Sequence, residues 1–186
     1  MRLSFVRLSL VGASFVALVL AGAAGTAVHA QQVTKEAVPG ITNFARVQTT
    51  VACAGAVEAS AVPDIKKLGF ASVINLRQAS EQGANIESEG AAAKAVGLNY
   101  FSIPFNPAAP DPNLVPTFLA AVTAPANQPA FIHCAGGGRA ASMWLIKRMQ
   151  VDGWEEQRAV EEATALGLTN ERLKQFALDW VQTHKQ

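Results

Sequence analysis

An α/β fold with a mainly parallel central sheet is predicted by the order of apolar segments along this chain. Short apolar segments, of which 71–76 and 129–133 are the clearest, alternate with segments whose apolar residues recur at helical spacing. Strands that alternate with helices in this way form a parallel sheet through right-handed crossovers, with helices on both faces. After Arg139 the pattern is helical throughout, so we expect an all-helical C-terminal part.

The bounds of each element follow from its periodicity and from the glycine or proline that ends it. Gly69 and Gly97 end two of the helical segments, and the prolines of 105–112 predict a loop. Residues 52–55 are small and are expected to form a turn. The expected strands are 44–47, 71–76, 98–103 and 129–133, and the expected helices are 58–68, 86–96, 113–122, 140–149, 155–165 and 171–184.

Residues 1–30 have the features of a signal peptide. Arg2 and Arg7 precede an uncharged apolar run that ends in Val28-His29-Ala30, which has the small-x-small form of a cleavage site. An uncleaved membrane anchor is the alternative, because about 20 apolar residues span a bilayer. Cleavage leaves a loose lead-in over 31–43 and one domain over 44–186, in a protein that is periplasmic or secreted and has no membrane segment.

Composition argues against several classes of function. Without Arg2 and Arg7, 13 of the 15 basic residues remain against 14 acidic ones, a net charge of −1 with no basic patch for nucleic acid. Two cysteines, Cys53 and Cys134, are too few for a disulfide scaffold, and with His133 and His184 they are too few for a zinc site. We therefore expect neither a metal nor a cofactor.

The segment 131–141, FIHCAGGGRAA, carries the chemistry of the chain. It lies where a strand passes into a helix, and ligands of open parallel sheets collect at this edge, where a helix N-terminus offers unpaired N–H groups. Glycines that can take positive φ allow successive amides to surround one anion. The residues expected to form this anion-binding loop are Ala135, Gly136, Gly137 and Gly138. An inert glycine-rich turn is the structural alternative.

Cys134 and Arg139 are the candidate catalytic residues at the two ends of this loop. The amides and the helix dipole favour the thiolate form of Cys134, which is the nucleophilic form. The planar guanidinium of Arg139 suits two oxygens of a phosphate or of a sulfur oxyanion. His133 is expected either to steady the loop by bonding to its carbonyls and favour the thiolate, or to be an ordinary buried histidine.

Several segments resemble the superfamily of dual-specificity and tyrosine phosphatases, in particular the phosphatase-like domain of beta-lactamase hydrolase-like proteins. They are VINLR at 73–77, Glu81, Glu87, residues 91–105 and residues 131–141, within about 44–150. The resemblance implies a three-layer phosphatase-like fold, with Cys134 as nucleophile and Arg139 as oxyanion clamp. It also implies hydrolysis of a phosphomonoester through a phosphorylated cysteine.

Two departures from this family leave other functions open. Four residues separate Cys134 from Arg139, where phosphatases usually have five; four is similar to rhodanese-type sulfurtransferases, whose cysteine carries a persulfide. Ala140 stands where phosphatases commonly have the Ser or Thr that helps the thiolate leave. A module that binds an oxyanion without catalysis is the third hypothesis. In each case the partner is a phosphorylated or other oxyanion compound.

Three further residues have competing interpretations. Asp111 is the only carboxylate within 105–133, so it is the candidate general acid, but an Asp before Pro is also a good helix cap. Cys53 either pairs with Cys134 or is a free buried residue. Arg77 contacts the anion or, as the safer expectation, pairs with Glu81 or Glu87.

Overall fold

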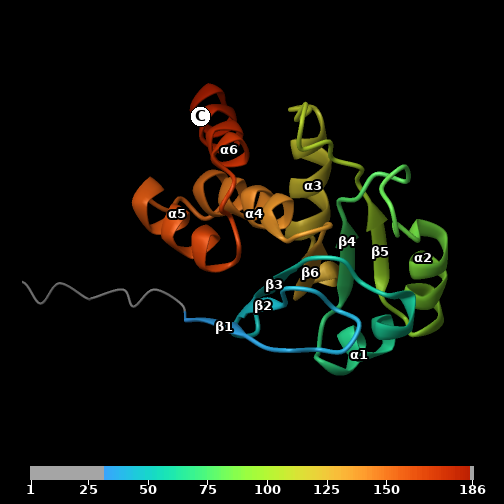
Figure 1. Cartoon of the computed structure of the whole chain (residues 1–186). Helices are drawn as coiled ribbons and strands as arrows, with labels where there is room; N and C mark the ends of the chain where they lie inside the picture. Colours follow the sequence, from blue (N-terminus) through green and yellow to red (C-terminus); the bar gives the residue numbers. More distant parts are fainter. Residues whose placement is uncertain (1–31, 185–186) are drawn as a thin grey trace, which may run out of the picture.

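A six-stranded mixed sheet forms the centre of the computed structural model, which describes residues 32–184 (Figure 1). Its strand order is β1-β2-β3-β6-β4-β5. The four strands from β3 to β5 are parallel, whereas β1 and β2 are added antiparallel at one edge. The strands are β1 (Val33–Lys35), β2 (Ala45–Val47), β3 (Val51–Ala54), β4 (Ser72–Asn75), β5 (Asn99–Ser102) and β6 (Ala130–His133).

Six α-helices cover the two faces of this sheet (Figure 1). On one face, α1 (Val62–Lys67), preceded by a 3₁₀ turn at Ala59–Ala61, and α2 (Ile86–Ala95) enclose the smaller apolar cluster. The other face carries a larger cluster under the remaining helices. They are α3 (Leu114–Thr123), followed by a 3₁₀ turn at Pro125–Asn127, α4 (Gly138–Gln150), α5 (Glu156–Ala165) and α6 (Glu171–Thr183). The predicted three-layer α/β architecture is therefore confirmed.

Three aromatic rings fill the core beneath α1 and α2. Phe131 in the central strand β6 lies with its ring centroid 6.1 Å from Phe44 in a stacked arrangement and 5.6 Å from Phe70 edge to face. All three side chains are at most 2% exposed. Offset and edge-to-face pairs add to the hydrophobic stabilisation of such rings. This cluster fixes β6, and with it the loop that follows.

Most expected elements lie within one or two residues of the observed ones, but the turn expected at 52–55 is wrong. Residues 51–54 form the fully buried strand β3, hydrogen-bonded to β2 on one side and to β6 on the other. Alanine and cysteine have no strong strand propensity. The segment is a strand because two neighbouring strands satisfy its backbone groups inside the core.

The lead-in expected to be loose over 31–43 contains a strand as well. Within it, β1 pairs with β2 in the register Val33↔Val47, and Val33 packs against the larger cluster. The proposed signal peptide lies outside the described residues. Within 32–184, no helix is both long and apolar enough to cross a bilayer.

Phe70→Ala tests the aromatic cluster. Removing a ring that is 2% exposed leaves a cavity against Phe44 and Phe131, so we expect the free energy of unfolding to fall by about 3–5 kcal/mol in urea denaturation. Val151→Ala, at a side chain that is 49% exposed, is the control and should change it by less than about 0.5 kcal/mol. Equal effects of the two substitutions would contradict this description of the core.

Candidate active site

Cys134 lies at the carboxyl edge of the sheet, between the ends of β3 and β4. Its backbone N–H donates to the carbonyl of Ala54 over 3.2 Å, and the carbonyl of His133 accepts from the amide of Leu76 over 2.9 Å. Cys134 is 1% exposed, and α4 begins four residues later, at Gly138. The strand-to-helix setting expected for the loop is therefore present.

A backbone amide of the loop contacts the sulfur of Cys134. Gly137 N–H donates to Sγ over 3.1 Å, an arrangement that stabilises negative charge on the sulfur. Gly137 has φ of +101°, which only glycine adopts readily. Gly136 and Gly138 do not have positive φ. The expectation that the glycines of the loop take positive φ is therefore confirmed for Gly137 only.

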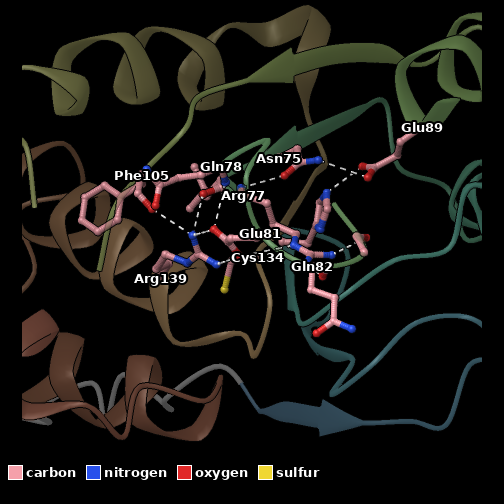
Figure 2. A network of polar contacts seen from close by, with 12 residues as sticks. Asn75, Arg77, Gln78, Glu81, Gln82, Glu89, Phe105, Cys134 and Arg139 are labelled. Atoms are coloured by element: carbon pink, nitrogen blue, oxygen red, sulfur yellow. Dashed lines mark hydrogen bonds and ion pairs between the residues drawn. The ribbon is translucent and has the colours of Figure 1, made fainter. Parts of the chain in front are cut away.

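Arg139 is held by three segments that end at the same edge of the sheet (Figure 2). Its Nη1 donates to the carbonyl of Leu76 over 3.0 Å and to the carbonyl of Phe105 over 2.8 Å. Nη1 and Nη2 also form a two-point ion pair with the carboxylate of Glu81, at 2.5 and 2.7 Å. This end of the guanidinium, formed by Nη1 and one N–H of Nη2, is therefore fully hydrogen-bonded, and these bonds position the side chain.

The remaining edge of the guanidinium, Nε–H and the second Nη2–H, has no carbonyl or carboxylate acceptor within residues 32–184. In Figure 2 the sulfur of Cys134 lies beside this group. Burial alone would lower the pKa of Arg139, but hydrogen bonds and charge interactions with Glu81 and Cys134 raise it. A planar pair of donors next to a thiol is suited to hold two oxygens of one anion.

The hydrogen-bond partners of Glu81 stabilise the ionised form of its side chain. Burial acts to raise its pKa, but hydrogen bonds from Arg139, from the backbone of Gln78 and from Arg77, together with the charge of Arg139, lower it to about 2. Glu81 therefore stays ionised at neutral pH. The sequence indicates Glu81 only as a partner of Arg77 and through the family resemblance, because its contact with Arg139 spans 58 residues of sequence.

Arg77 holds the loop that presents Glu81 (Figure 2). Its guanidinium donates to the carbonyls of Gly83 and Gln82 over 2.8 and 2.6 Å, and its Nε lies 3.4 Å from Glu81. The expected pairing of Arg77 with Glu81 is confirmed. Arg77 thus fixes the position of Glu81 and, through it, that of Arg139.

His133 belongs to a buried polar network on the opposite face of the sheet. Its Nε2 lies 2.6 Å from the carboxylate of Glu89, which also accepts from Asn75 Nδ2 over 3.1 Å. Asn75 Nδ2 lies 3.0 Å from the hydroxyl of Tyr100. Nδ1 of His133 has no partner within the described residues, so the expected contact of this ring with loop carbonyls is not formed. The reason is that strand alternation turns His133 away from the side of Cys134.

Asp111 is exposed and makes the contacts of a turn residue. Its Oδ1 accepts from the amide and the side chain of Asn113, both over 2.9 Å, just before α3 begins at Leu114. The loop that carries it starts at Phe105, whose carbonyl binds Arg139. The N-cap of α3 is Asn113, without a side-chain cap hydrogen bond, so Asp111 orders the turn before the helix and is not its cap. The role of Asp111 as general acid remains a prediction.

Cys53 is a free buried thiol on the same side of the sheet as Cys134. Burial raises the pKa of Cys53 well above its usual range, and the charges of Cys134 and Glu162 act in the same direction. Cys53 pairs with Ile132 across the sheet, two residues before Cys134. Both cysteines are free in the structure, which agrees with the interpretation of Cys53 as a buried small residue.

Glu81→Gln tests the ion pair through its pH dependence. Because the pKa of Glu81 is lowered from 4.5 to about 2 by folding, its stabilisation is present above pH 4.5 and is lost as the pH falls towards 2. We expect the substitution to lower the free energy of unfolding by about 2 kcal/mol at pH 7, and by progressively less below pH 4.5, in urea denaturation. Glu87→Gln, at an exposed glutamate, should show neither effect. A difference between wild type and Glu81→Gln that is constant from pH 7 to pH 3 would contradict the assignment.

The sequence and the fold of this chain are similar to those of known proteins. Residues 43–151 match the family model of the beta-lactamase hydrolase-like protein, phosphatase-like domain. No curated protein sequence matches the chain.

Solved structures of phosphatases share its fold. TpbA of P. aeruginosa superimposes with a TM-score of 0.59 at 22% identity, over 80% of this chain and 88% of TpbA, and a TpbA variant has been solved in complex with pTyr. The core catalytic domain of the PP-IP phosphatase SIW14 of S. cerevisiae, in complex with citrate, gives 0.63 at 19% identity over 77% of this chain and 88% of that one. A protein of Shewanella putrefaciens classed with phosphatases gives 0.64 at 20% identity over 78% and 95%. The family match covers more than half of the sequence, and the chain therefore belongs to the phosphatase-like domain family of beta-lactamase hydrolase-like proteins.

Proposed function

We propose that this protein is an exported cysteine-dependent phosphatase that hydrolyses a phosphomonoester at Cys134. One observation carries the proposal: Arg139, fixed by Glu81, turns a pair of donors that have no carbonyl or carboxylate acceptor within residues 32–184 towards a thiol whose sulfur already accepts the amide of Gly137. A phosphoryl group in this position would have its oxygens on Arg139 and on loop amides, with phosphorus facing the sulfur. Such positioning and charge stabilisation account for most of the catalysis of phosphoryl transfer.

The proposed reaction has two steps. The thiolate of Cys134 attacks phosphorus, the bond from phosphorus to the ester oxygen breaks, and the leaving oxygen takes a proton from a general acid. Water then attacks the cysteinyl phosphate, which releases inorganic phosphate and regenerates the thiolate. Arg139 balances the charge of the phosphoryl oxygens in both steps.

Asp111 is the proposed general acid. The loop that carries Asp111 begins at Phe105, whose carbonyl binds Arg139. Further along this loop, the carbonyl of Ala108 accepts a hydrogen bond from Arg172 on α6 over 3.3 Å. The carboxylate is exposed, so it can exchange its proton with solvent between turnovers. Its second oxygen has no hydrogen bond within the described residues, so the turn and the acid function can coexist.

The relatives support a phosphorylated substrate. A TpbA variant was solved in complex with pTyr, and SIW14 is a PP-IP phosphatase that was solved with citrate, itself an oxyanion. Export of this protein is supported by the charged start, apolar run and cleavage motif of residues 1–30. The resulting location is the periplasm or the exterior of the cell.

Sulfur transfer is the second candidate, because four residues between Cys134 and Arg139 match the loop length of rhodanese-type enzymes. In that reaction thiosulfate would bind at Arg139, the thiolate would take its outer sulfur as a persulfide, and sulfite would leave. Cyanide would then accept the sulfur as thiocyanate. The same preparation assayed for phosphate and for thiocyanate separates the two functions.

Cys134→Ser tests the nucleophile. We expect wild type to release phosphate from p-nitrophenyl phosphate and to form no thiocyanate from thiosulfate and cyanide, and we expect Cys134→Ser to lose phosphate release by at least about a thousandfold. Cys53→Ala is the matched control and should retain activity, since Cys53 is a buried thiol outside the loop. Wild type without phosphate release between pH 4 and 8, or with thiocyanate formation instead, would refute the proposal; anion binding without any turnover would favour a non-catalytic module.

Asp111→Asn separates the role of Asp111 as general acid from its role in the turn before α3. Asparagine keeps the side-chain oxygen that accepts from Asn113, so the thermal midpoint should stay within about 2 °C of wild type. Loss of the acid should lower kcat about 100-fold or more for an alkyl phosphate, which leaves poorly without a proton, and much less for p-nitrophenyl phosphate. Equal effects on the two substrates would exclude Asp111 as the acid.

A further inference from the structure

We propose that the cavity beside the anion-binding loop binds an apolar organic group of the substrate, so that the preferred substrate is a phosphomonoester with an apolar body larger than one aromatic ring. This inference rests on the proposed phosphatase function, because it assigns the phosphoryl group to the loop. The cavity itself is a feature of the fold and can be tested without turnover.

The cavity has a volume of about 790 Å³ and opens next to the loop at Gly136. Asn43, on its wall, donates from Nδ2 to the carbonyl of Gly136 over 3.2 Å. A Cβ placed on Gly136 would meet no heavy atom within 4 Å, so the space above this residue is open. An organic group attached to a phosphate on the loop therefore has a path into the cavity.

Two segments far apart in the sequence form its walls: residues 35–45, which include the end of β1, and the turn 166–169 between α5 and α6 (Figure 1). Both lie next to the loop. Asn43 donates to the carbonyl of Gly136, and the carbonyl of Gly167 would lie 3.7 Å from a Cβ built on Gly138. Each wall therefore adjoins the anion site.

The size and lining of the cavity identify the guest. Pockets of roughly 300–1,000 Å³ hold whole organic ligands, so this space exceeds what a phosphate or a single ring needs. Apolar residues are prominent in its lining, among them Val38, Ile41, Phe44 and Leu166. Among the described lining residues Lys35 is the one cation, and Glu36 stands next to it. A polyphosphorylated guest needs several cations, whereas an apolar body gains by leaving water.

Most of this wall lies outside the part of the chain that matches the family. The match covers 43–151, whereas 35–41 and 166–169 flank it on both sides. The cavity is therefore built largely by segments outside the part that matches the family, next to a loop that lies within that part. In this arrangement the loop takes the phosphoryl group and the flanking walls contact the rest of the substrate.

Direct binding of two phosphonates tests the inference. Naphthylmethylphosphonate and methylphosphonate share the anionic group and are not hydrolysed, so calorimetry measures the contribution of the apolar body alone. We expect wild type to bind the naphthyl compound at least about tenfold more tightly. Equal affinities, or no binding of either compound, would overturn the inference.

Two variants locate the effect in the cavity. Val38→Asp puts a charge on the apolar wall, and Thr169→Trp fills the space from an exposed position, so each should reduce the affinity ratio of the two phosphonates towards one. Ala91→Asp, on the exposed side of α2, adds the same charge elsewhere and should leave the ratio unchanged. Circular dichroism checks that each variant is folded. If neither wall variant changes the affinity ratio of the two phosphonates, the naphthyl group binds elsewhere and the assignment is refuted.

Phosphate release distinguishes failure of this inference from failure of the proposed function. Wild type that hydrolyses naphthyl phosphate and glycerol phosphate with equal kcat/KM would retain the phosphatase function and refute the role of the cavity. Selective binding of the naphthyl phosphonate by a protein that releases phosphate from neither ester would refute the phosphatase function and retain the cavity.

Discussion

The ion pair between Arg139 and Glu81 is the interaction on which the geometry of the site depends. Arg139 also binds the carbonyls of Leu76 and Phe105, so one guanidinium joins the chain after β4, the chain after β5 and the first turn of α4. Taking a charged side chain that is 5% exposed out of water is costly unless it is fully paired. The pairing uses one end of the guanidinium and leaves its other edge for an anion, so the same contacts that permit burial also position the donors.

The surrounding structure limits how far this pair can move. Arg77 fixes the loop of Glu81, and on the opposite face His133 and Glu89 form a buried contact of 2.6 Å directly before Cys134. The aromatic cluster around Phe131 holds the strand from which the loop starts. Loop, clamp and strand are therefore fixed by separate sets of contacts, as a preorganised anion site requires. The cavity at Gly136 lies beside this site, and most of its lining residues fall outside 43–151.

Much of the fold and part of the site could be predicted from the sequence. The helices and the strands β4 and β6 have apolar periodicity and glycine stops, so local pattern determines them. The strand β3 was missed because its small residues take strand geometry only through pairing with β2 and β6. Cys134 and Arg139 were found because six consecutive residues contain both. Glu81 and Glu89 were not assigned to the site, since their contacts to Arg139 and His133 span 58 and 44 residues and arise from tertiary packing alone.

The most direct measurement of the central claim, that Cys134 and Arg139 hold one oxyanion for attack by the thiolate, is mass spectrometry of the protein quenched in acid during turnover of an aryl phosphate. The account predicts a phosphoryl group on the peptide that contains Cys134, and its absence when the sulfur has been alkylated beforehand. A Cys134 peptide that stays unmodified while phosphate is released, or a phosphoryl group found on another residue, would contradict it.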